Sequence, residues 1–316
     1  MPCLWDSLHT YRSAGAIVKA GTLQACSTAA TKRRRYNLGV LLCYITDRRQ
    51  FPGTERQKRE RLLEKIAEAA LAGVDFIQLR EKDLPPRELV ELAREALRRT
   101  RNGSAQAQHS HVSFANVGHQ TASRSQGEPR NSKLLINSRV DVALAVGADG
   151  VHLTSTDIPA SDARAVWASA VAQNSTLETR NWIVAVSCHT PDEVRLAESH
   201  GADFAVFAPV FEKVVPDGID GGRRTVTRHA GGEGLAQLRE ACRAPGRPVG
   251  PEGIGTTRMP VLALGGITLG NAAACIEAGA AGVAAIRLFQ DNDVASVTEM
   301  LRNLAVAQLP ELAGGS

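Results

Sequence analysis

The chain has 316 residues, 43% of them hydrophobic, which is enough to bury a large aliphatic core as one α/β domain or two smaller ones. Its formal net charge of +4 arises in the first 35 residues, which hold six basic residues and one acid. The remainder is neutral and gives no support for a nucleic-acid partner. No apolar run approaches the ~20 residues that cross a bilayer, so no membrane segment is expected.

Residues 1–36 form a basic tail that is rich in Ala, Ser and Thr and ends in the run Lys32–Arg35. We predict that this tail is disordered, and an organelle transit segment is the alternative. The six cysteines of the chain lie far apart, without the Cys-x-x-Cys spacing of a zinc or redox pair. They are expected to be free thiols of a cytoplasmic protein.

Short apolar strands and amphipathic helices alternate after the tail. Val40–Ile45 is predicted to be a strand, and Gln57–Ala72 has apolar residues at helical spacing. A second strand starts near Val74 and leads into Gln78. The six other predicted strands are Lys133–Asn137, Val151–Leu153, Trp182–Ser187, Phe204–Phe207, Val261–Leu264 and Val283–Ile286.

A glycine-containing joint between a helix and the next strand recurs along the chain. Its copies are Ala72–Asp75, Val146–Gly150, His200–Phe204 and Ala278–Gly282. A glycine after a helix takes the left-handed conformation without steric cost. The repetition and the alternation of eight strands with helices predict a single (β/α)₈ TIM barrel over residues 37–308. A doubly wound open sheet is the alternative.

Two stretches interrupt this pattern. Residues 101–132 are polar and almost free of aliphatic side chains, so we expect a disordered insertion. Residues 215–258 follow the sixth strand and contain one helical piece, Leu235–Cys242; this insertion is either a lid or a flexible loop. His109, His111 and His119 in the first insertion are a weak metal-site candidate.

Side chains after the predicted strands converge at one end of such a barrel. Gln78, Arg80 and Lys82 have the same parity along the second strand and its extension. Two cations and an amide suit an anionic ligand such as a pyrophosphate. The alternative is a surface ion-pair cluster with Glu81 and Asp83.

The strand ends of the second half offer a phosphate site. Gly265-Gly266 opens a helix after the seventh strand, and Ile286 ends the eighth. Backbone N–H groups at such turns bind phosphate in many barrels. Asn137, after the third strand, and Lys213, after the sixth, are further candidates for substrate binding.

Three residues are candidates for a metal site or for proton transfer. Asp157 either binds Mg²⁺ together with substrate oxygens or caps the following helix. His189 precedes a helix N-terminus, which favours a neutral imidazole that transfers protons. The alternative is that Ser187 and His189 only order their loop through hydrogen bonds.

Several motifs, in order along the chain, resemble thiamine-phosphate synthase and its sister family, the TenI-type thiazole tautomerase. They are Gln78–Asp83, Asn137–Leu144, Gly147–Leu153, Val186–Thr190, Pro209–Phe211 and Gly265-Gly266. The resemblance extends from about Tyr44 to Phe289, with the two insertions between. It implies a transferase of thiamine biosynthesis that couples hydroxymethylpyrimidine pyrophosphate with thiazole phosphate, giving thiamine phosphate and pyrophosphate.

The resemblance also implies roles for individual residues. Gln78, Arg80 and Lys82 would grip the pyrimidine pyrophosphate, and backbone near Gly266 and Ile286 would hold the thiazole phosphate. Mg²⁺ would help the pyrophosphate to leave. The chain departs from the synthase pattern in two places. Ser138 replaces an Asp that binds Mg²⁺, which leaves Asp157, and Glu212-Lys213 replaces part of a Thr-x-Thr-Lys loop.

Two other functions stay open. A tautomerase would be an isomerase that uses His189 as acid and base and needs neither Mg²⁺ nor pyrophosphate, but its pattern tends to lose the trio Gln78, Arg80 and Lys82. A non-catalytic barrel would only bind thiazole phosphate or thiamine phosphate. The expected partners are small phosphorylated molecules, and a homo-oligomer is left open.

Overall fold

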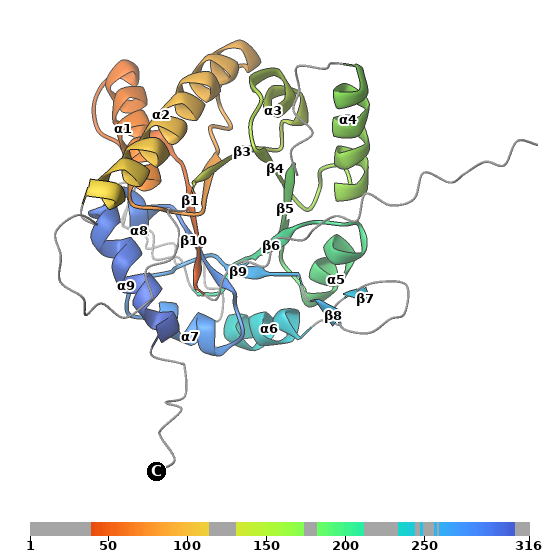
Figure 1. Ribbon diagram of the computed structural model, residues 1–316. Coiled ribbons are helices and arrows are strands. Elements are labelled where there is room, and N and C mark those ends of the chain that lie inside the picture. Colours follow the sequence, from red (N-terminus) through yellow and green to blue (C-terminus); the bar gives the residue numbers. More distant parts are fainter. Residues whose placement is uncertain are drawn as a thin grey trace, which may run out of the picture. The chain divides into compact units, whose positions relative to one another are not determined.

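Eight parallel strands close into a barrel in the order β1-β10-β9-β6-β5-β4-β3-β2 (Figure 1). The strands are β1 (Leu41–Ile45), β2 (Phe76–Leu79), β3 (Lys133–Asn137), β4 (Gly150–Leu153), β5 (Ile183–Cys188), β6 (Phe204–Phe207), β9 (Val261–Ala263) and β10 (Gly282–Ala285). Pairing of β1 with β10, from Leu41 opposite Gly282 to Tyr44 opposite Ala285, closes the ring. The predicted TIM barrel is therefore confirmed, and the open sheet is excluded.

The computed structural model describes residues 39–113, 131–173, 182–211, 233–243, 247–248, 256–257 and 259–306. These residues belong to the unit Leu38–Ser316. The tail 1–36 and Lys213 lie outside the described residues, as do the predictions made for them. Among the described helices, none is long and apolar enough to span a membrane. Cys43, Cys188, Cys242 and Cys275 form no disulfide.

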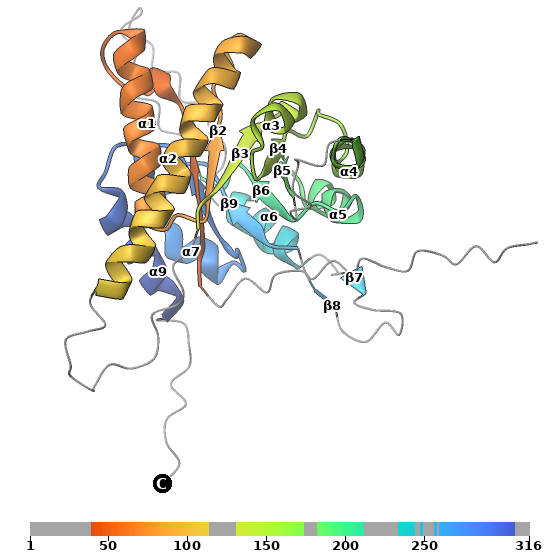
Figure 2. The same cartoon turned by 45° about the horizontal axis from the view of Figure 1, so that its top comes forward.

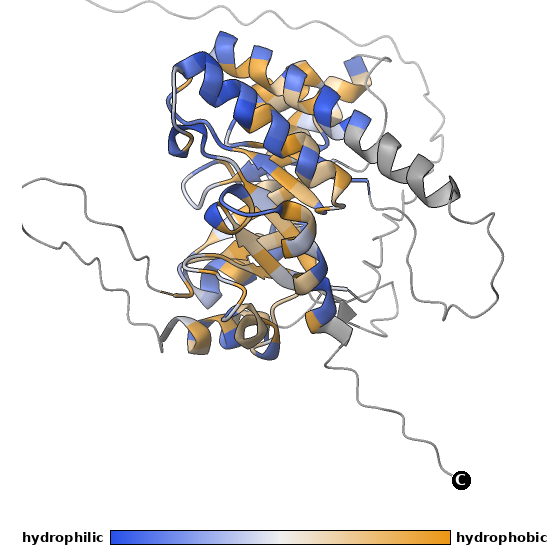
Figure 3. Ribbon diagram, turned by 90° about the vertical axis from the view of Figure 1, so that its left-hand side faces the viewer, coloured by the Kyte–Doolittle hydropathy of each residue, from blue (hydrophilic) through white to orange (hydrophobic). Residues whose placement is uncertain are grey.

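Helices surround the barrel, and α1 and α2 lie side by side (Figures 1 and 2). The helices are η1 (Arg48–Gln50), α1 (Glu55–Leu71), α2 (Pro86–Ser113), α3 (Val140–Val146), α4 (Ala160–Gln173), α5 (Pro191–Ser199), α6 (Glu233–Cys242), α7 (Ala272–Glu277), α8 (Arg287–Gln290) and α9 (Val294–Val306). They carry hydrophobic residues toward the strands and hydrophilic residues outward (Figure 3). In α1, Thr54 and Gln57 form a capping box, and Leu62 and Ile66 are fully buried.

A compact apolar cluster fills the barrel interior. Its buried members are Leu41, Cys43, Ile45, Phe76, Leu135, Ala185, Phe204, Val206, Leu262 and Ala284. The rings of Phe76 and Phe204 stack with centroids 4.5 Å apart. Because side chains alternate along each strand, the next interior positions toward the C-terminal ends belong to Gln78, Asn137, His152 and Ser187. The apolar cluster therefore ends where a polar layer begins.

The structure corrects the description of both insertions. The expected disorder of residues 101–132 is wrong for the first part, because α2 continues to Ser113. A helix that has already nucleated extends at low cost through residues such as Ala and Gln, even with Gly103 inside it. The second insertion contains α6, as predicted, and an unpredicted antiparallel pair, β7 (Arg247–Pro248) and β8 (Thr256–Thr257). Its remaining residues lie outside the described ranges.

Candidate active site

Four polar side chains form the layer above the apolar interior. The Gln78 Nε2 group donates to Asn137 Oδ1 at 2.8 Å, and the Asn137 amide donates in turn to Ser138 Oγ at 3.0 Å. His152 Nε2 lies 3.0 Å from Ser187 Oγ. Gln78 and His152 are only 2% and 1% exposed. The structure therefore brings Gln78 and Asn137 into contact, and likewise His152 and Ser187, at the C-terminal ends of their strands.

Two atoms of this layer lack a hydrogen-bond partner in the described structure, namely Gln78 Oε1 and His152 Nδ1. A buried polar atom without a partner costs about 1–3 kcal/mol. Both atoms are buried, so their lack of a partner is an energetic cost of the layer and does not by itself indicate a ligand.

His152 is neutral at pH 7. Burial, followed by the nearby positive charge of Arg80, lowers the pKa of His152 from 6.5 to about 4. An uncharged ring beside Arg80 avoids repulsion between two cations at the barrel mouth. His152 lies within the sequence motif Gly147–Leu153, but the sequence does not reveal its contact with Ser187.

The buried neutral His152 predicts a specific dependence of stability on pH. The unfolded chain binds the proton near pH 6.5 and the folded chain only near 4. The contribution of the neutral His152 to the free energy of unfolding is therefore complete above pH 6.5. About 3 kcal/mol of that contribution is lost as the pH falls to 4. Urea unfolding of the wild type between pH 7 and 4 should show this loss, and a His152→Gln variant should show a smaller slope. Equal slopes for the two proteins would contradict the assignment.

Arg80 and Lys82 make no ion pair with any described residue. The carboxylates next to them in sequence, Glu81 and Asp83, are bound by Arg48 at 3.0 and 2.7 Å. The alternative of a surface ion-pair cluster for Arg80 and Lys82 is therefore wrong. Arg80 is half-buried and Lys82 is exposed, so both cations are left for an anionic ligand.

Arg48 is a site residue that the sequence reasoning missed. Its hydrogen bonds lower the pKa of Asp83 to about 2, so this carboxylate is charged at pH 7. The sequence feature that could have predicted such a residue is the alternation of cations with acids from Arg80 to Asp83. If the two cations bind a ligand, then the two acids need a cationic partner from elsewhere in the chain, which is the role that Arg48 fills.

The turn after β9 exposes backbone N–H groups. Gly265 and Gly266 have positive φ angles of 101° and 61°. The Asn271 side chain holds this turn, accepting from Thr268 N at 2.8 Å and donating to Gly266 O at 2.9 Å. The amides of Gly265 and Gly266 have no acceptor among the described residues. Ile286 is the N-cap of α8, where the N–H groups of Arg287 and Leu288 have no acceptor among the described residues, whereas Phe289 N donates to Ile286 O at 3.2 Å.

Asp157 and Ser138 offer few ligands for a metal. Asp157 Oδ2 accepts from Thr154 N at 2.7 Å, so the carboxylate holds the turn after β4. Its other oxygen has no hydrogen-bond donor among the described residues. Ser138 contributes one neutral hydroxyl from a backbone with φ 58°. No group of three or more His, Cys, Asp or Glu side chains gathers among the described residues. Mg²⁺ fits here only if substrate oxygens and water complete its shell.

His189 lies at the end of β5, just before Thr190, the N-cap of α5. Its Nδ1 is 2.7 Å from the carbonyl oxygen of Ala208. A carbonyl can only accept, so Nδ1 carries a proton and Nε2 of the neutral ring has a free lone pair. The backbone N–H of His189 donates to Glu193 Oε2 at 2.6 Å. These bonds order the loop, and they also orient a base.

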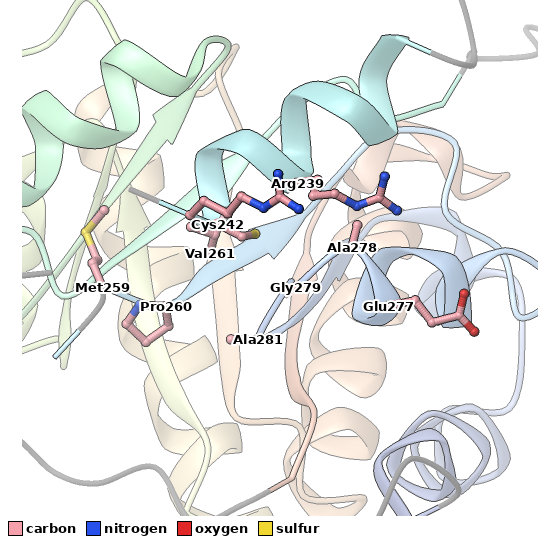
Figure 4. Close-up of a pocket in the computed structure, with 10 residues that line it drawn as sticks. Arg239, Cys242, Met259, Pro260, Val261, Glu277, Ala278, Gly279 and Ala281 are labelled. Carbon is pink, nitrogen blue, oxygen red and sulfur yellow. The ribbon is translucent and has the colours of Figure 1, made fainter. Parts of the chain in front are cut away.

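A hollow of about 450 Å³ lies at the opposite end of the barrel, where β9 and β10 begin (Figure 4). Its lining includes Arg239, Cys242, Met259 and Gly279. None of the predicted site residues lines this hollow. The polar layer and the unpaired cations therefore mark the C-terminal ends of the strands as the candidate active site.

Comparison with known proteins identifies chains that are similar to this one. A family model described as "Thiamine monophosphate synthase" matches residues 113–289. The thiamine-phosphate synthase of Moorella thermoacetica is 32% identical over 77% of this chain and 87% of its own length. The thiamine-phosphate synthase of Roseiflexus sp. is 33% identical over 78% of this chain and 77% of its own length. A solved thiamine phosphate pyrophosphorylase from Pyrococcus furiosus has a TM-score of 0.55 and 27% identity, covering 85% of this chain and 96% of that one.

Proposed function

The chain belongs to the thiamine monophosphate synthase family, and on that basis we propose that it joins hydroxymethylpyrimidine pyrophosphate to thiazole phosphate. The products are thiamine phosphate and pyrophosphate, so the enzyme is a transferase of thiamine biosynthesis. One observation carries the proposal most directly. Arg80 and Lys82 form no ion pair with a described residue, although two carboxylates adjoin them in sequence.

The site divides into three parts that match the substrates. Arg80 and Lys82 receive the pyrophosphate, whose oxygens pair well with two cations. The amides of Gly265, Gly266 and the first turn of α8 receive the phosphate of the thiazole. The aminopyrimidine ring lies against Gln78 and the other members of the polar layer.

The reaction needs positioning and charge stabilisation more than proton transfer. The bond from the pyrimidine methylene carbon to the pyrophosphate oxygen breaks, and its electron pair leaves with the pyrophosphate. The thiazole nitrogen then gives its lone pair to the cation-like methylene, forming the new carbon–nitrogen bond. Arg80 and Lys82 stabilise the negative charge that grows on the leaving group. Ser187 orients His152 and keeps the polar layer fixed.

Mg²⁺ is proposed as a cofactor that arrives with the substrate. Asp157 would supply one carboxylate oxygen and Ser138 one hydroxyl, and pyrophosphate oxygens and water would complete the shell. When bound, the ion would neutralise charge on the leaving pyrophosphate. Lys213 is proposed as a further cation at the same substrate.

A second candidate function rests on the orientation of His189. Its free Nε2 is suited to move a proton on a thiazole, as an isomerase of the TenI type requires. Such a reaction gives the two unpaired cations no pyrophosphate to bind. The synthase is therefore the better supported of the two reactions.

The experiment that separates these functions supplies purified protein with both substrates and Mg²⁺. We expect thiamine phosphate and pyrophosphate in equal amounts, with none formed when one substrate is left out or when EDTA removes the metal. No product under any metal condition, with thiazole phosphate still bound, would favour the non-catalytic barrel. Isomerisation of carboxylated thiazole phosphate, abolished in His189→Ala, would instead identify a tautomerase.

A further inference from the structure

Arg48 is an almost fully buried cation at the mouth of the barrel, with 3% of its surface exposed. Its guanidinium donates to Asp83 through two nitrogens, at 2.8 and 2.7 Å, and to Glu81 at 3.0 Å. Its Nε group donates to Glu55 at 2.5 Å. Its backbone N–H also faces the Glu81 carboxylate, at 3.2 and 3.3 Å. The residue thus binds both acids of the segment Arg80–Asp83.

Thr46 extends this network to the backbone of Arg80. The Thr46 hydroxyl donates to Glu81 Oε1 at 2.7 Å and accepts from Arg80 N at 2.9 Å. Thr46 is fully buried, so water does not replace these bonds. Gln290 anchors the same loop, since its Nε2 group donates to Asp47 O at 2.9 Å. The Arg80 N–H is therefore held by a buried hydroxyl that is itself fixed on Glu81.

The network also decides which charges of the segment are paired. Arg80, Glu81, Lys82 and Asp83 alternate cations with acids. Arg48 occupies the two carboxylates, and its own positive charge is offset by Glu55. Without Arg48, those carboxylates would be free to bind Arg80 and Lys82, whose side chains would then be unavailable to an anion.

We propose that Arg48, together with Thr46, is a positioning residue for the pyrophosphate site. It binds Glu81 and Asp83 so that the interleaved Arg80 and Lys82 present their charges to the pyrophosphate. This role rests on the proposed function, because pyrophosphate is the anion in question. Each of the three guanidinium nitrogens of Arg48 donates to a carboxylate, so we assign this residue no contact with the substrate.

Binding of inorganic pyrophosphate tests this role without turnover. Isothermal titration calorimetry of Arg48→Met should give a Kd about tenfold or more above that of the wild type, since charge-assisted contacts of two cations are lost. The Kd for thiazole phosphate should stay within about twofold of the wild-type value, because its site lies at the other strands. In steady-state kinetics of Arg48→Met, the KM for the pyrimidine pyrophosphate should likewise rise, and the KM for thiazole phosphate should stay near the wild-type value.

Arg48→Met leaves a buried Glu81 carboxylate uncompensated and risks unfolding, so a second pair of variants is needed. Thr46→Val keeps the shape but removes the hydroxyl, and should weaken pyrophosphate binding about fivefold to tenfold. Thr46→Ser restores the hydroxyl and should restore binding. Thr298→Val is the matched control, because Thr298 is also a buried threonine but its hydroxyl has no partner in the described structure.

These experiments distinguish failure of the proposed synthase function from failure of the positioning role of Arg48 and Thr46. Wild-type protein that binds pyrophosphate but forms no thiamine phosphate would refute the proposed function and leave the positioning role to be judged by the variants. Equal pyrophosphate affinities of wild type, Thr46→Val and any folded Arg48→Met would overturn the positioning role. Failure of the wild type to bind pyrophosphate would overturn it as well.

Discussion

Arg80→Met is expected to lower kcat/KM for thiamine phosphate formation by about 100-fold to 1000-fold, the loss seen when one preorganised donor to developing charge is removed. Arg80 is half-buried and has no ion pair with a described residue, so its guanidinium is free to follow the charge on the leaving pyrophosphate. Methionine keeps much of the side-chain length but removes every donor. Steady-state kinetics with both substrates measure the effect.

The matched control for this substitution is Arg98→Met. The Arg98 side chain is 69% exposed on α2 and pairs with Glu95 on the same helix. Its loss should leave kcat/KM unchanged, because a surface ion pair contributes little and lies away from the strand ends. If Arg80→Met retained activity within about threefold of the control, then Arg80 would have no part in binding the leaving group.

Gly282→Ala is expected to destabilise the barrel by about 3 kcal/mol or more. A Cβ atom at Gly282 would lie 1.9 Å from the carbonyl oxygen of Leu41 and 2.6 Å from its carbon. Both atoms belong to the backbone of β1, in the pair of strands that closes the barrel. The clash can be relieved only by moving the strands apart, which breaks hydrogen bonds of the closing ladder.

Urea unfolding measures this destabilisation, with Gly270→Ala as the control. At Gly270 the nearest atom to an added Cβ is Thr268 Oγ1 at 3.9 Å, an ordinary contact. The control should unfold at the wild-type urea concentration, and Gly282→Ala should unfold much earlier or fail to fold. A wild-type midpoint for Gly282→Ala would show that β1 and β10 are packed less closely than described.

The barrel was predictable because its repeating unit is visible in the sequence. Each glycine joint, such as Ala72–Asp75, ends a helix and starts a strand, and Gly73 has the expected positive φ of 76°. The predicted strands Lys133–Asn137 and Phe204–Phe207 agree with β3 and β6 in full. The length of α2 was not predictable, because polar composition resembles a loop when the stabilising effect of an existing helix is ignored.

The members of the candidate site could be predicted where the alternation of side chains along a strand alone decides which side chains face the barrel interior. Gln78, Asn137 and Ser187 face the barrel interior because they continue the alternation of their strands. Long-range pairing decides the rest. The contacts of Arg48 with Glu81 and Asp83 join residues more than 30 positions apart, and the bond from His189 to Ala208 spans 19. Nothing in the local sequence pattern assigns those partners. Only the structure shows that Arg48, and not Arg80, binds the carboxylates of Glu81 and Asp83.

The role of Arg80 and Lys82 in binding pyrophosphate can be seen in a crystal structure of the protein with bound pyrophosphate and thiamine phosphate. We expect pyrophosphate oxygens within about 3 Å of the side-chain nitrogens of Arg80 and Lys82. We also expect that the phosphate ester of thiamine phosphate accepts from the amides of Gly265 and Gly266. Pyrophosphate bound elsewhere, with Arg80 turned to Glu81 or Asp83, would contradict the role of Arg80 and Lys82.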